Sequence, residues 1–222
     1  MRGVFVTGTG TEVGKTVVSA VLARSAAAAG ARVAVFKPAV SGLDEGGEPD
    51  HALLRRAAES SQSDHEIAPY RYGPPVSPHL GAELAGERID PGLLREAAIR
   101  AGGGADLLLV EGVGGLLVPL TLGYLVRDFA RDLALPVVVA ASPELGTINH
   151  TLLTIEGLRA VGLEIAAVVL TPWPQAPGDV QRSNREAIQQ LGGVRVETLA
   201  QIDLSDPSSW PRLELEEIGA AP

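Results

Sequence analysis

The chain has 222 residues, of which 45% are hydrophobic and 4% aromatic, and its formal net charge is −9. This length predicts a single domain over residues 1–222 with an aliphatic core, and the absence of cysteine excludes disulfides, thiolate nucleophiles and sulfur-bound metal centres. The acidic balance argues against nucleic acid and anionic membranes as partners. No apolar run approaches ~20 residues and no signal peptide is recognisable, so we expect a cytoplasmic location.

The first predicted element is a strand at Val4–Val6, which is followed by a turn rich in glycine and threonine and by an amphipathic run over Val17–Leu22. The turn, residues 8–16, has the sequence GTGTEVGKT. Its glycines allow the backbone N–H groups to turn inward, and the start of the helix adds a partial positive charge. A strand, a glycine-rich turn and a helix in this order predict a phosphate-binding loop.

Two side chains at the end of this loop suit a nucleoside triphosphate. Lys15 can reach the outer phosphates, and the hydroxyl of Thr16 can ligate a magnesium ion. The standard pattern has a glycine six residues before the lysine. That position is Thr9 here, and the nearest glycine is Gly8, one residue earlier. The Gly-Lys-Thr ending and the strand-to-helix context are intact.

Strand and helix patterns alternate through the rest of the chain. The predicted strands are Arg32–Phe36, Leu107–Val110, Pro136–Ala141 and Ile165–Leu170, and the predicted helices are Asp50–Ala58, a helix that starts at Asp90-Pro91, Tyr124–Leu133, Thr147–Val161 and Asp179–Leu191. The helix after Asp90 is expected to bury Leu93, Leu94, Ala97 and Ala98. Residues 59–78 are polar and proline-rich and predict a long surface connection, and residues 207–222 predict loose packing. The alternation predicts a three-layer α/β/α fold around a mostly parallel sheet.

Ligands of such sheets bind at the carboxyl ends of the strands. This rule brings together the loops that follow Val6, Phe36 and Val110. Lys37 stands at the second of these strand ends, and we expect its ammonium group to lie beside the phosphates. Ser41 continues the same loop.

Glu111 follows a buried strand directly and precedes the glycine-rich residues 112–115. An acid at this point, next to a phosphate loop, is placed to supply a carboxylate to the magnesium of a nucleotide; the alternative is a solvated acid in a flexible turn. Asp50 also has two interpretations. It is either the N-cap of its helix or a further oxygen ligand of the ion held by Thr16 and Glu111. The four histidines show no metal-ligand spacing.

Taken together, these segments resemble the dethiobiotin synthetase family, which has the P-loop NTPase fold. The matching segments occur in the family's order and spacing and are Phe5–Thr16, Lys37–Gly42, Ser77–His79, Val110–Leu116 and Gly146–Thr151. The one-residue offset of the phosphate loop is itself the family's form. These motifs are specific, and they cover roughly the first three-quarters of the chain.

The resemblance implies a reaction. 7,8-Diaminopelargonate takes up CO2, the dehydrated form of bicarbonate, as a carbamate on one amine. A carbamate oxygen attacks the γ-phosphate of ATP. The second amine then closes the carbamic–phosphoric anhydride into the cyclic urea of dethiobiotin and releases phosphate. The enzyme is a ligase of biotin biosynthesis that requires Mg²⁺.

The resemblance also implies roles for particular residues. The catalytic residues would be Lys37, Lys15 and Thr11, and the metal ligands Thr16, Asp50 and Glu111. The nucleotide would be bound by Gly8, Glu12, Val13, Gly14, Lys15, Thr16, Val17, Asp50, Glu111, Gly112, Val113, Gly114, Thr171 and Pro172. The substrate would be bound by Thr11, Lys37, Ser41, Gly115, Gly146, Thr147, Ile148 and Asn149. The last four would reach it across the interface of a homodimer.

The chain departs from the family where the base is bound. Thr171-Pro172 stands where the family often has Asn-Asp or a similar amide, and residues 199–202 show no clear Gly-x-Ile-Pro segment. We therefore expect ATP as the co-substrate, with another nucleoside triphosphate as the alternative.

Three other assignments have counterarguments. A chromosome-partition ATPase carries a signature lysine where this chain has Gly10. The ligase part of a cobyrinic acid amide synthase is joined to a glutaminase domain with a catalytic cysteine, and this chain has no cysteine. A binding module without catalysis does not explain Lys37 and Ser41.

Overall fold

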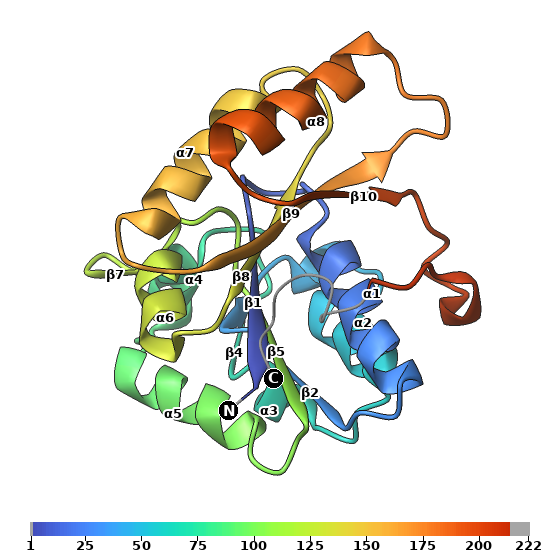
Figure 1. Ribbon diagram of the computed structural model, residues 1–222. Coiled ribbons are helices and arrows are strands. Elements are labelled where there is room, and N and C mark those ends of the chain that lie inside the picture. Colours follow the sequence, from blue (N-terminus) through green and yellow to red (C-terminus); the bar gives the residue numbers. More distant parts are fainter. Residues whose placement is uncertain (1, 214–222) are drawn as a thin grey trace.

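The centre of the molecule is a six-stranded sheet, seen in a computed structural model that describes residues 2–213 (Figure 1). The strand order is β10-β9-β8-β1-β5-β2, and every neighbouring pair is parallel. The strands are β1 (Gly3–Gly8), β2 (Val33–Phe36), β5 (Leu107–Glu111), β8 (Val137–Ala141), β9 (Ile165–Trp173) and β10 (Val196–Ala200). Because the strands are parallel, the loops that follow β1, β2 and β5 lie at the same edge of the sheet.

Helices cover both faces of this sheet (Figure 1). One face carries α1 (Lys15–Ala28), α2 (Asp50–Ala57) and α3 (Asp64–Ile67), and the other carries α5 (Pro91–Ala101), α6 (Val126–Leu133), α7 (Thr147–Arg159) and α8 (Asp179–Gly192). The predicted three-layer α/β/α fold is confirmed. No helix within residues 2–213 combines the length and the apolar character that crossing a membrane requires.

The central strand β1 serves both cores because its side chains alternate between the two faces. Val4 and Val6 belong to the core under α1 and α2, whereas Phe5 belongs to the opposite core. The ring of Phe5 meets that of Phe129 edge-on, with a centroid distance of 6.1 Å and an interplanar angle of 71°. Phe129 also lies 6.1 Å from the ring of Phe36. This packing fixes β1 and β2 relative to each other.

The segment between α2 and α4 (Pro78–Ala85) is more ordered than the long surface connection that its composition predicts. It contains α3, which starts with a capping box in which Ser63 and Glu66 bond each other's backbone N–H groups, and β4 (Tyr70–Arg71), which pairs with β3 (Ala39–Val40). Gln62 bonds both backbone groups of Val35 and so covers the free edge of β2, as a paired strand would. These elements span only about one hydrophobic period each, so no repeat of the pattern reveals them.

Three smaller predictions need correction. Leu93 is 57% exposed, and the buried face of α5 is centred on Leu94 and Ala98. The predicted helix at Tyr124 starts instead at Val126, because Tyr124–Leu125 forms strand β7, which pairs with β6 (Pro119–Thr121). Within the stretch predicted to pack loosely, Trp210 is buried and its indole N–H donates to the carbonyl of Asp203 at 2.7 Å. The rest of that prediction, residues 214–222, lies outside the described residues.

Arg32 and Asp106 tie together the starts of β2 and β5. The backbone N–H and the guanidinium of Arg32 both donate to the Asp106 carboxylate, at 2.9 to 3.1 Å. These hydrogen bonds, together with the charge of Arg32, lower the pKa of Asp106 from 3.8 to about 2. The pair therefore holds two strands whose opposite ends carry candidate site residues.

This pair makes a prediction about acid stability. A depressed pKa in the folded state stabilises the fold above the unfolded value, and the stabilisation is lost as pH falls toward the folded value. We expect the wild type to have a higher melting temperature than Asp106→Asn at pH 7, and the difference to shrink between pH 3.8 and about 2. Thermal melts across this range measure it. A difference that stays constant down to pH 2 would contradict the assignment.

Candidate active site

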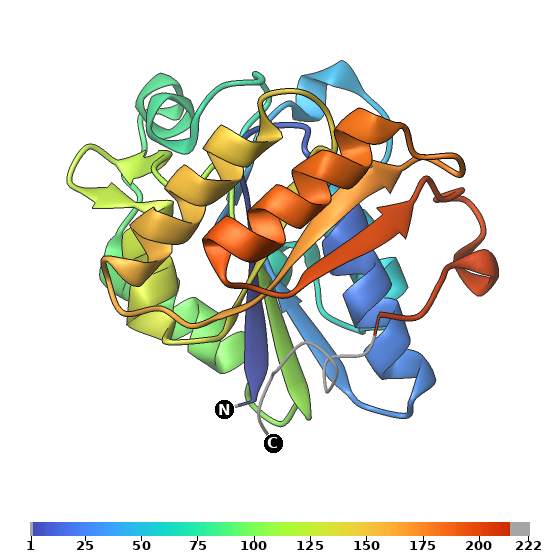
Figure 2. The ribbon, with the colours of Figure 1, turned by 45° about the horizontal axis from the view of Figure 1, so that its top comes forward.

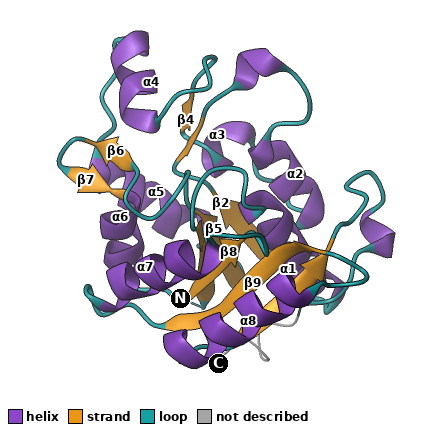
Figure 3. Ribbon diagram, turned by 90° about the horizontal axis from the view of Figure 1, so that it is seen from above, coloured by secondary structure: helices purple, strands orange, loops and turns teal. Residues whose placement is uncertain are grey.

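A cleft of about 680 Å³ opens at the carboxyl edge of the sheet. Its walls come from the turn after β1, the loop after β2, the start of α2, the loop after β5 and the segment before α4. Figure 3 looks down on this edge and shows α4 and the β6–β7 hairpin at its periphery. The three strand-end loops expected to meet therefore do meet around one cavity.

The phosphate loop has the conformation that its glycines allow. Gly14 has a φ of 87°, in the left-handed region that favours glycine. A Cβ at Gly14 would also lie 2.4 Å from Cγ2 of Thr171, so this position tolerates no side chain. The Lys15 ammonium donates to the carbonyl of Gly10 at 2.7 Å, across the loop. Burial lowers the pKa of Lys15, and the nearby charge of Lys37 adds to this effect.

The most unusual feature of the cleft is a buried lysine held by two acids. Lys37, 3% exposed, donates to Glu111 Oε1 at 2.6 Å and also to Asp50. Burial alone would lower the pKa of Lys37, but the two carboxylates outweigh it and the net shift is upward. Burial likewise favours a raised pKa for Asp50, and the Lys37 charge reverses it into a lowered one. Both shifts favour the charged forms, so this is an ionic cluster.

Lys15 and Lys37 are the only lysines in the 222-residue sequence, and all other basic side chains except histidine are arginines. Both lysines line the same cleft. Arginine presents a broad planar group, whereas lysine presents a compact charge that can approach a single oxygen closely. The chain therefore has lysine only where a compact ammonium group on a flexible side chain would contact the terminal phosphates of a triphosphate.

The oxygen atoms beside this cluster suit a magnesium ion. Glu111 is fully buried, its Oε1 also accepts a hydrogen bond of 2.9 Å from the Thr16 hydroxyl, and its Oε2 has no partner among the described residues. A buried carboxylate oxygen without a partner is rare and fits a cation ligand. Residues 2–213 contain no group of three or more acidic, histidine or cysteine side chains arranged to hold a metal alone. Magnesium commonly takes one or two carboxylates and completes its shell with phosphate and water.

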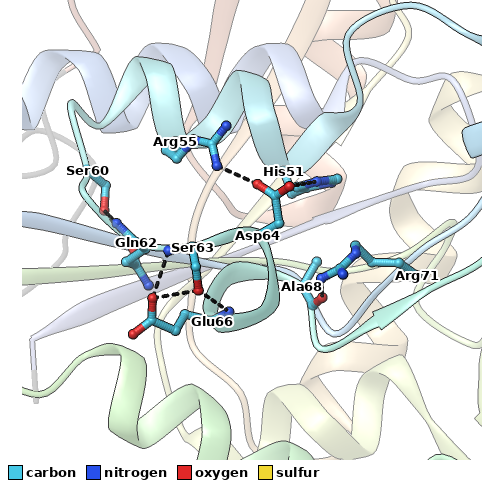
Figure 4. Close-up of polar contacts among 9 residues, drawn as sticks. All are labelled: His51, Arg55, Ser60, Gln62, Ser63, Asp64, Glu66, Ala68 and Arg71. Carbon is cyan, nitrogen blue, oxygen red and sulfur yellow. Dashed lines mark hydrogen bonds and ion pairs between the residues drawn. The ribbon is translucent and has the colours of Figure 1, made fainter.

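The position of Asp50 follows from the anchoring of α2. Pro49 is the N-cap of this helix and Asp50 is its first residue, so the prediction that Asp50 caps the helix is wrong. Its carboxylate bonds Lys37 instead. Further along α2, Arg55 pairs with Asp64, and the buried His51, which follows Asp50, has its Nε2 3.7 Å from the same carboxylate (Figure 4). These contacts hold α2 against α3 and fix where Asp50 emerges.

The structure brings most of the predicted site residues together. Those that line the cleft are Thr11, Glu12, Gly14, Lys15, Thr16, Val17, Lys37, Ser41, Asp50, Val113 and Gly114. Glu111 lies beneath, bonded to Thr16 and Lys37. Gly115 packs against the backbone of Gly8 and Gly10, close enough that a Cβ would come within 3.7 Å.

The remaining predicted residues lie outside the lining of the cleft. Gly8 is the last residue of β1, Val13 belongs to the phosphate loop and Gly112 follows β5, whereas Thr171-Pro172 lies near the end of β9 beside Gly14. Gly146 and the first residues of α7 belong to a separate strand end, after β8. The cleft also has lining residues without a predicted role, namely Ala39, Val40, Glu45, Pro75, Val76, Ser77, Pro78 and Val118. For Ser77 and Pro78, the sequence did hold a signal, because the segment Ser77–His79 is one of those that match the family.

Comparison with known proteins identifies the family. Residues 2–212 match the family described as an AAA domain. The chain is 43% identical over 195 residues to the ATP-dependent dethiobiotin synthetase BioD of Rhodococcus erythropolis, a match that covers 86% of this chain and 84% of the relative. The chain belongs to the dethiobiotin synthetase family. The corresponding protein of Bacillus subtilis is 36% identical, over 88% of this chain and 85% of the relative. That of Anaeromyxobacter dehalogenans is 45% identical, over 77% and 76%.

The fold is shared more widely than the family. The MinC:MinD cell division complex of Aquifex aeolicus contains a chain with a TM-score of 0.57, covering 91% of this chain and 82% of its own length, at 16% identity. This similarity concerns the fold alone. Sequence identity thus favours a dethiobiotin synthetase, a ligase that forms a cyclic urea, over the partition-ATPase and amide-synthase alternatives.

Proposed function

We propose that this chain closes the urea ring of dethiobiotin from 7,8-diaminopelargonate, CO2 and ATP, in the cleft described above. The observation that carries the proposal is the convergence of both lysines of the chain with Thr16, Asp50 and Glu111 on one cavity. Phosphoryl transfer depends on positioning and on neutralising charge more than on covalent chemistry. A cavity with two cations and convergent oxygen ligands supplies both.

Different residues of the cleft bind the nucleotide, the carbamate and the diamine. The backbone of the phosphate loop cradles the nucleotide, and Lys15 exchanges the Gly10 carbonyl for the outer phosphates. Lys37, which stands between that loop and Ser41, contacts the carbamate and the transferring phosphoryl group. Thr11 and Ser41 line the cavity on either side and hydrogen-bond the carbamate and the diamine. The second amine is held close enough to displace phosphate and close the ring.

Magnesium fits this set of donors. Thr16, Asp50 and Glu111 would hold it, with the partnerless Oε2 of Glu111 as the strongest sign. The ion supplies neutralisation of the phosphate charge when it is bound. Because Lys37 bonds both acids in the structure, its ammonium has to give up part of this pairing when magnesium and nucleotide enter.

We place the carboxylate of the substrate at the start of α7 of a second subunit. Gly146 has a φ of 96° and no side chain caps the helix, so the N–H groups of Ile148 and Asn149 in its first turn are available to an anion. Leu145, just before α7, is 90% exposed. A homodimer, which the family resemblance implies, would place Leu145 and the start of α7 at its interface. The cytoplasmic location stays a prediction.

The base of the nucleotide makes a separate prediction. Thr171 is 3% exposed and Pro172 has no N–H group, so the end of β9 offers no side-chain amide to read the adenine edge. We expect GTP and CTP to support turnover within about tenfold of ATP, because a missing polar contact costs little where no polar group is left unpaired. Steady-state rates with each triphosphate measure this. A preference for ATP above a thousandfold would show that another segment reads the base.

The decisive test of the function is direct. Purified protein is incubated with 7,8-diaminopelargonate, bicarbonate, magnesium and ATP, and dethiobiotin is followed by mass spectrometry. We expect product and phosphate in equal amounts, and none when the diamine or the triphosphate is left out. If no triphosphate gave dethiobiotin, the proposed function would be refuted.

A further inference from the structure

Asn184 is a buried polar residue outside the cleft, on the middle of α8. It is 4% exposed, and its side-chain NH2 group donates to two backbone carbonyls, that of Pro143 at 2.9 Å and that of Glu144 at 3.2 Å. Both carbonyls belong to the loop between β8 and α7. α8 lies alongside α7, so a residue of one helix reaches the loop that leads into the other (Figure 2).

Filling of the core does not by itself require an amide at this position. Burying an amide costs free energy unless its donors are satisfied, and an apolar residue of similar size would fill the same space without that cost. One turn further along α8, the fully buried Ile188 fills its space in that way. Asn184 is therefore placed to hold the two loop carbonyls rather than to fill the core.

The carbonyl of Glu144 connects Asn184 to the start of α7. It also accepts the N–H of Thr147, the first residue of the helix, at 3.1 Å. The turn is tightened further by Ser142, whose hydroxyl accepts the N–H of Glu144 at 3.3 Å. Asn184 thus fixes the carbonyl of Glu144, which bonds the first N–H of α7. By holding this start of the helix, it also sets the direction of the free N–H groups of Ile148 and Asn149.

From these contacts we infer that Asn184 is a positioning residue for substrate recognition: by clamping the carbonyls of Pro143 and Glu144, it aims the first turn of α7 at the carboxylate of the diamine. The inference rests on the proposed function and adds a residue to it. If α7 serves the neighbouring subunit, Asn184 acts on the active site of the partner. The positioning is specific to one end of the substrate, since α8 contributes no residue to the nucleotide cleft.

The test compares two diamines in wild type and variants. One is 7,8-diaminopelargonate, and the other is the same molecule with its carboxyl group replaced by hydrogen. In Asn184→Leu, which removes both donors and keeps the volume, we expect the KM for the natural diamine to rise about tenfold or more. We expect the KM for ATP and the kinetics of the decarboxylated diamine to change less than twofold. The preference of the enzyme for the acid therefore falls by about the same factor.

Two controls separate positioning from general damage. Ile188→Ala weakens the packing of the same helix without touching the loop, and we expect it to lower the melting temperature while leaving the preference between the diamines unchanged. Asn184→Asp keeps the shape and replaces the donor by an acceptor, so it provides a second variant if Asn184→Leu folds poorly. An equal loss for both diamines, or no loss for either, would overturn the role of Asn184. A wild type that forms no dethiobiotin would instead refute the proposed function.

Discussion

Replacing Lys37 by methionine is expected to lower kcat by at least about a hundredfold, while the affinity for nucleotide changes little. A preorganised charged donor at a transferring phosphoryl group is worth on the order of 3 kcal/mol, which corresponds to this factor. The side chain is buried and oriented by Glu111 and Asp50 before any substrate enters, so little reorganisation is needed at the moment of reaction. Lys15, which bonds the phosphate loop, remains to bind the nucleotide.

The measurement combines turnover with binding. Dethiobiotin formation gives kcat, and calorimetry with a non-hydrolysable triphosphate gives the nucleotide affinity of wild type and variant. Lys37→Arg is the matched variant, because it keeps the charge; we expect it to stay at least about tenfold impaired, since a planar guanidinium does not fit between two carboxylates at the position of a compact ammonium. A Lys37→Met enzyme with full turnover would show that the lysine is structural only.

The phosphate loop shows how much of this site the sequence reveals. Its glycines, its Lys-Thr ending and the neighbouring strand and helix are local features, and local chemistry determines the loop conformation: Gly14 adopts the left-handed φ that the motif requires. The convergence of Lys37 and Glu111 was also predictable, because parallel strands place their carboxyl ends at one edge. β2 and β5 are in fact neighbours in the sheet, with Phe36 opposite Val110.

What could not be predicted is the contact between these groups. Asp50 had two interpretations, and the capping one is wrong because Pro49 precedes the helix and Asp50 faces Lys37. Whether one lysine bonds two nearby acids at once, as Lys37 bonds Asp50 and Glu111, depends on distances of a few tenths of an ångström that no pattern encodes. The short elements α3 and β4 were not predicted for a different reason, since each spans only about one period and shows no hydrophobic repeat.

The side chain of Glu111 is expected to contribute both to the stability of the fold and to the chemistry of the site. In Lys37→Met, the Glu111 carboxylate loses its buried cation and keeps only the hydroxyl of Thr16. Leaving one charge of a buried pair uncompensated costs about 3–5 kcal/mol. We therefore expect Lys37→Met to unfold at clearly lower denaturant concentration than the wild type, and added Mg²⁺ to restore part of the loss by binding the unpaired carboxylate of Glu111.

A double-mutant cycle tests this prediction. Glu111→Gln keeps the shape and removes the charge, so the double variant should be more stable than Lys37→Met alone, and the coupling should amount to about 1–3 kcal/mol. The same Glu111→Gln change should lower kcat/KM for magnesium-dependent turnover by about 10²–10³-fold, because it removes the buried ligand that has a free oxygen. Stability comes from urea denaturation and metal affinity from thermal shifts with Mg²⁺ and nucleotide. Strict additivity of the two substitutions would mean that the ion pair contributes nothing to the fold, and unchanged magnesium dependence would remove Glu111 from the metal site.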